Sequence, residues 1–157
     1  NGSPDTAFGT GGDWAPTIGA GCNGLSLALT PVDDGSVVGS FSTVACGLVH
    51  VAPNGTAGAW GDLSSLGNAN VGGVQAGPGN TVYVRTGSSM SFPTASDRIL
   101  RLTATGAVDT TFGTNGTIDT TNISGVSYPT TMSILRDGSM LFSQALGFSF
   151  DAATSTR

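Results

Sequence analysis

The stretch DTAFGTGG at residues 5–12 decides the fold of this chain, because it returns as DTTFGTNG at residues 109–116. A degenerate copy, AGAWG, lies midway at residues 57–61. The aromatic residues of the copies follow one another at equal intervals of 52 residues: Phe8, Trp60 and Phe112. A fixed period of this length is typical of an array of like structural units. We therefore expect one domain, 1–157, of three repeats: 5–56, 57–108 and 109–157.

Each repeat shows the same order of strands and turns. In the first repeat, alternating apolar residues at 25–29 are followed by an Asp-Gly turn at 33–36, a return strand at 37–38 and a further strand at 48–51. The counterparts are turns at 78–81 and 136–139 and strands at 82–84, 99–102, 132–135 and 140–142. Asp-Gly and Pro-Gly favour hairpins because glycine accepts positive φ. Three strands and a fourth short element per repeat predict an all-β fold of β-propeller blades. A β-sandwich is the competing all-β fold, but it does not predict the regular period.

The composition supports strands and turns over helices. Only 10% of the 157 residues are charged, all five cations are Arg, all ten anions are Asp, and Lys and Glu are missing. Lys and Glu favour exposed helices, so their absence argues against a helical protein. The net charge of −5 argues against binding to nucleic acid, whose phosphates would be repelled. No apolar run approaches the roughly 20 residues that a membrane-spanning helix needs.

The repeats resemble a known family. Residues 106–116, with the strand at 98–102 before them and the segment at 136–141 after the next loop, look like the delta-60 repeat, a propeller-type repeat of bacterial secreted and surface proteins. The resemblance covers nearly the whole chain and is weak around Trp60, where Ala57 stands in place of Asp. It implies a propeller scaffold in an extracellular or cell-surface setting. The family carries no established catalytic residues to transfer to this chain.

Three blades are too few to close a propeller ring, which typically needs at least four. The last repeat also ends before its final strand. Unpaired strand edges invite pairing with another chain. We expect the sequence to be part of a longer polypeptide, whose remaining segments complete the ring. The alternatives are copies that close a ring together and copies that add edge to edge into a filament.

The repeated motifs supply the predicted structural positions. We expect each aromatic residue and the glycine after it to form a wedge between blades: Phe8 with Gly9, Trp60 with Gly61, and Phe112 with Gly113. Asp5 and Asp109 open the two clear copies, and we expect each carboxylate to cap its own turn. Calcium bound through these carboxylates is the alternative, although the ligand-dense spacing of a calcium loop is missing. We otherwise expect no cofactor and no metal.

Other residues suggest a bridge, a ligand contact or chemistry. Cys22 and Cys46 are the only cysteines, and we expect a disulfide between them, with two buried free thiols as the alternative. Trp14 is the candidate for stacking on a sugar, against the alternative of packing between blades. His50 is the only histidine, and we expect an exposed strand residue rather than a general base.

These patterns predict a protein that is not an enzyme. The expected function is a secreted or cell-surface propeller scaffold or adhesion module, whose partner is protein, either the rest of a longer chain or copies of itself. The alternatives are a self-assembling subunit that forms a ring or filament by strand-edge pairing, and a propeller that binds glycans.

Overall fold

The computed structural model describes residues 2–13, 28–40, 47–66, 71–86, 98–120 and 129–144. These residues form antiparallel strands in three sheets, with two short 3₁₀ turns at Ser64–Leu66 and Pro78–Asn80. The prediction of an all-β fold is confirmed. Among the described residues there is no helix of the length and hydropathy that crossing a membrane requires.

The first sheet is a four-stranded meander in which every strand pairs with the next one in sequence. Its strands are β1 (Ala28–Pro31), β2 (Val37–Ser40), β3 (Leu48–Val51) and β4 (Ala57–Trp60), in the order β1-β2-β3-β4. The second sheet repeats this order with β5 (Val71–Ala76), β6 (Val82–Thr86), β7 (Arg98–Leu102) and β8 (Thr117–Asp119). The third is a hairpin of β9 (Pro129–Ile134) and β10 (Met140–Gln144). Strands β2, β3, β6, β7, β9 and β10 coincide or overlap with predicted strands, and β1 overlaps the predicted run at 25–29. The sequence names no strand at β4, β5 or β8.

The sheets do not coincide with the predicted repeats. The last strand of the first sheet, β4, belongs to the predicted repeat 57–108, and β8 belongs to the predicted repeat 109–157. Each four-stranded sheet therefore takes its fourth strand from the repeat that follows. Residues 145–157, where the final strand of the third repeat is predicted to be missing, lie outside the described residues.

One turn type joins strands or strand-like segments at four places. In each turn, the backbone N–H of the fourth residue donates to the carbonyl of the first residue, as Gly35 does to Val32 at 3.0 Å. A glycine with φ between 80° and 83° occupies the same position every time: Gly35, Gly55, Gly106 and Gly138. Because L-residues with a side chain rarely adopt this conformation, the glycines fix where each hairpin reverses. The β5–β6 turn differs, and there Gly79 and Asn80 have positive φ.

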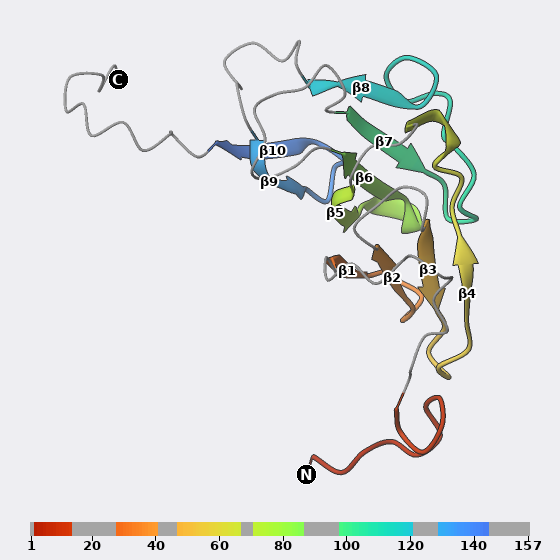
Figure 1. Cartoon of the computed structure of the whole chain (residues 1–157). Helices are drawn as coiled ribbons and strands as arrows, with labels where there is room; N and C mark the ends of the chain where they lie inside the picture. The colour runs from red at the N-terminus through yellow and green to blue at the C-terminus, as the bar shows by residue number, and fades with distance from the viewer. Residues whose placement is uncertain are drawn as a thin grey trace, which may run out of the picture.

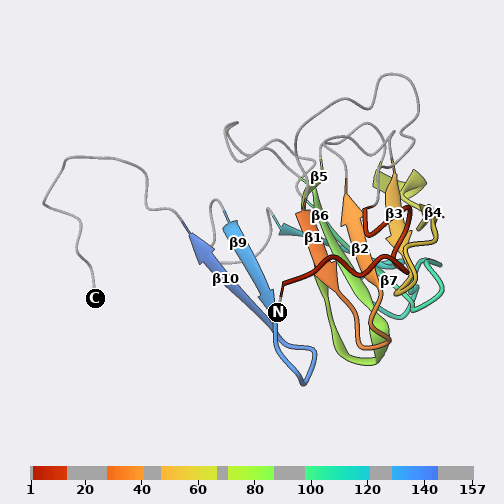
Figure 2. The ribbon, with the colours of Figure 1, turned by 90° about the horizontal axis from the view of Figure 1, so that it is seen from below.

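The sheets pack face to face in chain order, with the second sheet in the middle (Figure 1). Side chains alternate between the faces of a strand. In β6, Val82 and Val84 pack toward the first sheet, with Val38 and Leu48, whereas Tyr83 packs toward the hairpin. All five residues of β6 are therefore buried. Figure 2 shows the hairpin on the opposite side of the second sheet from β2 and β3.

Candidate functional site

The two clear copies of the Phe-Gly motif adopt the same local structure. In both, the amide of Phe8 or Phe112 donates to the carbonyl of the motif's Asp at 3.0 Å. The glycine four residues after the Phe donates back to the Phe carbonyl, at 3.0 Å in the first copy and 2.9 Å in the second. Gly9 and Gly113 have φ of 56° and 55°. Equal sequence thus gives equal backbone in two places 104 residues apart in the chain.

Asp109 is held by its own turn and by an arginine. One carboxylate oxygen accepts bonds from the amide of Thr111 at 3.1 Å and from its hydroxyl at 2.6 Å. The other accepts from Nε of Arg101 at 2.8 Å, with which Asp109 also forms an ion pair. The pKa of Asp109 is lowered, and the hydrogen bond from the Thr111 hydroxyl is the largest cause.

Both oxygens of Asp109 therefore serve the fold, as turn capping predicts. In the first copy, Asp5 accepts from the amide of Ala7 at 3.0 Å, which is the same capping contact. Within the described residues, no group of three or more His, Cys, Asp or Glu side chains is placed to hold a metal ion.

Phe112 is a core residue whose ring packs against the second sheet. It is 8% exposed and meets the ring of Tyr83 edge-on, with centroids 5.5 Å apart. The guanidinium of Arg101 lies over the Phe112 ring, 4.6 Å from its centroid. Phe8 is only partly buried. The same turn therefore places the Phe112 ring in the core between sheets and leaves the Phe8 ring partly exposed.

Trp60 differs from the two phenylalanines because it lies on a strand. It is the last residue of β4, pairs with Leu48, and packs against the core between the first two sheets. Its ring stacks on His50, with centroids 6.1 Å apart. Gly61, like the other motif glycines, has positive φ, and a side chain there would meet Leu102 at 2.9 Å. The middle motif keeps the glycine and the aromatic residue but changes the backbone around them.

His50 is not the exposed strand residue that the sequence predicts. It is partly buried, and its Nε2 lies 2.8 Å from the hydroxyl of Ser36, which in turn contacts Oδ1 of Asp34. The register brings them together, because Val38 pairs with His50 and Ser36 lies on the same face two residues earlier. The sequence predicts both strands that carry these residues. It does not predict the register of one strand against the other, and the contact between His50 and Ser36 depends on that register.

This order of groups differs from that of a hydrolase triad. The hydroxyl and the amide of Ser36 lower the pKa of Asp34, whose carboxylate accepts both bonds. Because the one hydroxyl hydrogen of Ser36 is donated to Asp34, Nε2 of His50 must carry the hydrogen of its bond to Ser36. A base needs a free lone pair facing the serine hydroxyl. We conclude that this trio stabilises the β1–β2 turn.

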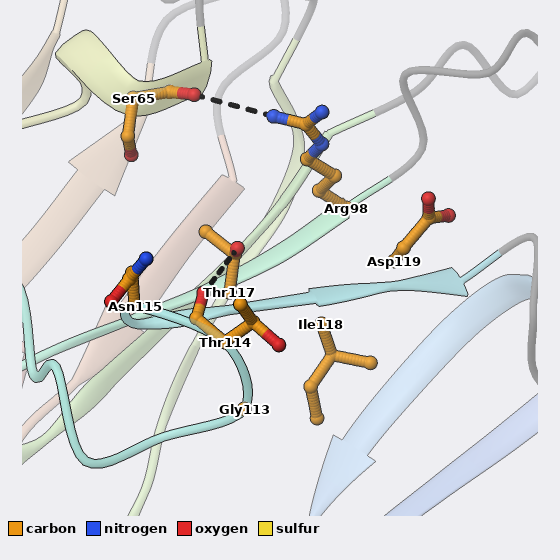
Figure 3. A pocket seen from close by; sticks show the side chains of 8 residues that line it. All are labelled: Ser65, Arg98, Gly113, Thr114, Asn115, Thr117, Ile118 and Asp119. Carbon is orange, nitrogen blue, oxygen red and sulfur yellow. Dashed lines mark hydrogen bonds between the residues drawn. The ribbon is translucent and has the colours of Figure 1, made fainter.

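A polar cleft opens beside the second Phe-Gly motif (Figure 3). Its volume is about 520 Å³, within the usual range for ligand pockets. The lining joins the 3₁₀ turn, the start of β7, the motif and β8: Ser65, Arg98, Gly113, Thr114, Asn115, Thr117, Ile118 and Asp119. The cleft gathers hydroxyl, amide, guanidinium and carboxylate groups around one apolar side chain.

Arg98 is loosely held in this cleft. Among the described residues, its guanidinium makes one hydrogen bond, of 3.4 Å, to the carbonyl of Ser65, and Figure 3 shows it directed there. A bond of that length is weak. Asn115 has φ of 52°, where the first motif has Gly11 with φ of 67°. Asn therefore occupies a left-handed position that glycine fills at lower cost, and this adds an amide to the lining.

A second cleft, of about 470 Å³, lies where the hairpin turns of the three sheets meet. The amide of Asp33 donates to Oδ1 of Asn80 at 2.8 Å, which ties the first turn to the second. Asp33 and Arg136 both line the cleft. These contacts hold neighbouring sheets at one end, and nothing in them selects a ligand.

The remaining predicted site residues, Trp14, Cys22 and Cys46, lie outside the described residues, so the sugar contact and the disulfide stay predictions. No protein-family model, curated protein or solved structure matches the chain. The resemblance to the delta-60 repeat is therefore also still a prediction.

Proposed function

We propose that this chain is a segment of a non-catalytic β-propeller that serves as a scaffold or adhesion module of a secreted or cell-surface protein. The observation that carries the proposal is the packing of successive antiparallel meanders. The sheets β1–β4 and β5–β8 have the same strand order, and the second is covered on one face by the first and on the other by the hairpin. β-Propellers are built from four-stranded blades arranged around a central channel, so this packing supports the proposal.

Contacts between the first strands of the sheets support the same arrangement. β1 contacts β5, and β5 contacts β9. The hydroxyl of Thr30 in β1 accepts a bond of 2.8 Å from the amide of Ala76 in β5. In a propeller, the first strand of every blade lies nearest the central axis, so these strands are the ones expected to meet. Electron microscopy of the native polypeptide tests the architecture, since a propeller gives a ring with radial blades and a sandwich gives none.

A scaffold role without catalysis is consistent with the polar groups that the fold brings together. The hydrogen bonds of the Asp34–Ser36–His50 trio and of the Arg101–Asp109 pair stabilise turns and strand ends. Fractionation of the source cells, with antibody against this chain, tests the proposed location. Recovery in the medium or on the surface supports the proposal, and recovery only inside the cell contradicts it.

Glycan binding is a second candidate function, favoured by the cleft at Arg98. Sugar hydroxyls both donate and accept hydrogen bonds, and the lining offers both kinds of group around the apolar Ile118. Thr117 corresponds to Asp13 in the first motif, so Ile118 corresponds to Trp14, the residue that the sequence singles out for sugar stacking.

The substitution Asn115→Gly tests this candidate, because Gly11 fills the same position of the first motif. Glycine accepts the same backbone conformation, so the substitution removes the side chain with its amide and leaves the turn in place. Binding to an array of mono- and oligosaccharides should be present in the wild type and weakened by about tenfold or more in the variant. Thr105→Ala, in a turn outside the cleft, is the matched control. A wild type that binds no sugar on the array contradicts glycan binding and leaves the scaffold proposal standing.

A further inference from the structure

The cleft beside the second Phe-Gly motif holds an arginine that the fold engages only weakly. Elsewhere in the described part of the chain, Arg101 forms an ion pair of 2.8 Å with Asp109. Arg85 is buried and donates to the carbonyl of Gly72 at 3.1 Å. The hydrogen bond described for Arg98 is 3.4 Å long, whereas a guanidinium carries five N–H donors. Arg98 therefore keeps most of its donors for another acceptor.

The carboxylate across the strand ladder does not pair with this guanidinium. Arg98 and Asp119 lie directly opposite each other on β7 and β8. Opposite charges in this relation are placed to interact. Among the described residues, however, no ion pair joins the two, and Figure 3 shows the groups apart. The guanidinium is therefore open to a carboxylate that a ligand brings.

The rest of the cleft offers neutral polar groups and one apolar side chain. The lining comes from the middle of the chain, 65–119, and not from either end. The hydroxyl of Thr117 donates to the carbonyl of Thr114 at 3.0 Å, so its oxygen remains an acceptor. The side-chain amide of Asn115 both donates and accepts, and Ile118 supplies apolar surface. These groups suit the hydroxyls and the C–H face of a sugar ring.

We propose that the cleft takes a sugar that carries a carboxylate, such as a uronic acid, with the carboxylate bound to the guanidinium of Arg98. The proposal rests on the glycan-binding candidate and adds the class of sugar. A carboxylate accepts two parallel bonds from a guanidinium. This pair replaces the weak contact to the carbonyl of Ser65. The ring hydroxyls then lie at Asn115 and Thr117, and the C–H face lies at Ile118.

The acidic character of the chain limits which acid fits. A net charge of −5 repels an extended polyanion. A single carboxylate in contact with Arg98 is affected less, because salt screens distant charges over about 8 Å. The like charge of Asp119 directs the ligand carboxylate to the Ser65 side of the guanidinium. The cleft is therefore suited to one acidic sugar residue among neutral ones.

Paired sugars that differ only at C6 test the proposal. Chemical-shift titration compares methyl glucuronide with methyl glucoside, and methyl galacturonide with methyl galactoside. At least one acid should bind about tenfold or more tightly than its neutral partner, because a hydrogen bond to a charged group is stronger than one to a neutral group. The preference should shrink in about 0.5 M NaCl, which screens the ion pair.

Matched arginine variants assign the preference to one side chain. Arg98→Gln should bring the acid and the neutral sugar to about equal affinity. Arg98→Lys should keep part of the preference, because lysine retains the charge without the bidentate fork. Arg136→Gln removes the same charge from an exposed turn outside this cleft and should keep the wild-type preference. Circular dichroism checks that each variant is folded, and the wild-type comparison needs no variant.

The outcomes separate this inference from the candidate on which it rests. A wild type that binds acid and neutral sugars equally overturns the acidic class and leaves glycan binding standing. A wild type that binds neither at about 50 mM overturns both. A preference that Arg98→Gln retains, or that Arg136→Gln loses, overturns the assignment to Arg98.

Discussion

Truncation of Phe112 to alanine is the sharpest test of the role that the Phe-Gly motif plays in the fold. The ring is 8% exposed and packs with Tyr83 and Ile99 in the core that joins the second sheet to the hairpin. Removing a buried phenylalanine side chain costs about 3–5 kcal/mol in the free energy of unfolding. That range includes the edge-on contact with Tyr83, about 0.5–1.5 kcal/mol, and the contact with the Arg101 guanidinium, about 0.5–1 kcal/mol.

Phe8→Ala is the matched control, because Phe8 sits in the same turn with its ring partly exposed. Less apolar surface is lost there, so we expect a cost of about 1–1.5 kcal/mol. Urea unfolding followed by tryptophan fluorescence measures both values. Phe112→Leu, expected at about 1–2 kcal/mol, keeps the test open if the alanine variant does not fold. The reasoning is refuted if Phe112→Ala costs no more than Phe8→Ala.

Three further predictions concern the turns. Gly113→Ala should cost about 2 kcal/mol or more in the free energy of unfolding in urea, because φ is 55° and the new side chain would lie 2.1 Å from the Thr117 carbonyl oxygen. In the control, Gly11→Ala, the new side chain meets no atom within 4 Å, so the cost should be only about 1 kcal/mol. Equal costs for the two variants would contradict the predicted clash. The pKa values of Asp34, Asp62, Asp109 and Asp137 are lowered below 3.8 by hydrogen bonds, in each case first from a side chain two residues on. The stability that these carboxylates contribute is therefore fully present above pH 3.8 and is lost as the pH falls through their lowered pKa values. The urea midpoint of unfolding should drop over that pH interval, and the drop should be smaller in Asp109→Asn. A drop of the same slope in the variant would count against the role of Asp109. His50→Gln should cost about 1 kcal/mol in stability and leave ester hydrolysis at the rate of buffer alone, as in the wild type; a wild-type rate above buffer that the variant loses would overturn the assignment of His50 to the turn.

The strands and their turns were predictable because their signals are local. The Asp-Gly turn at 33–36 and the apolar return strand at 37–38 need only a few neighbouring residues, and the structure has β2 and its hairpin there. Equal motifs at 5–12 and 109–116 likewise gave equal turns. The strand at Trp60 departs from that turn because its motif lacks the Asp that caps the others.

The contacts between strands were not predictable from one sequence. The bond between His50 and Ser36 depends on the register of β2 against β3, and a shift of one residue would send these side chains to opposite faces. Arg85 gave no sign of burial, yet it is 7% exposed and donates to the carbonyl of Gly72 at 3.1 Å. The cleft at Arg98 joins four segments, and its lining follows from packing that no motif encodes.

The central claim is that the second sheet lies between the other two, with neighbouring residues of β6 facing opposite partners. Nuclear Overhauser effects from the side chains of β6 measure this directly. The account predicts contacts from Val84 to Leu48 in the first sheet, and from the Tyr83 ring to Met140 or Phe142 in the hairpin. Contacts from both β6 side chains to the same neighbouring sheet, or a Tyr83 ring with none to the hairpin, would contradict it.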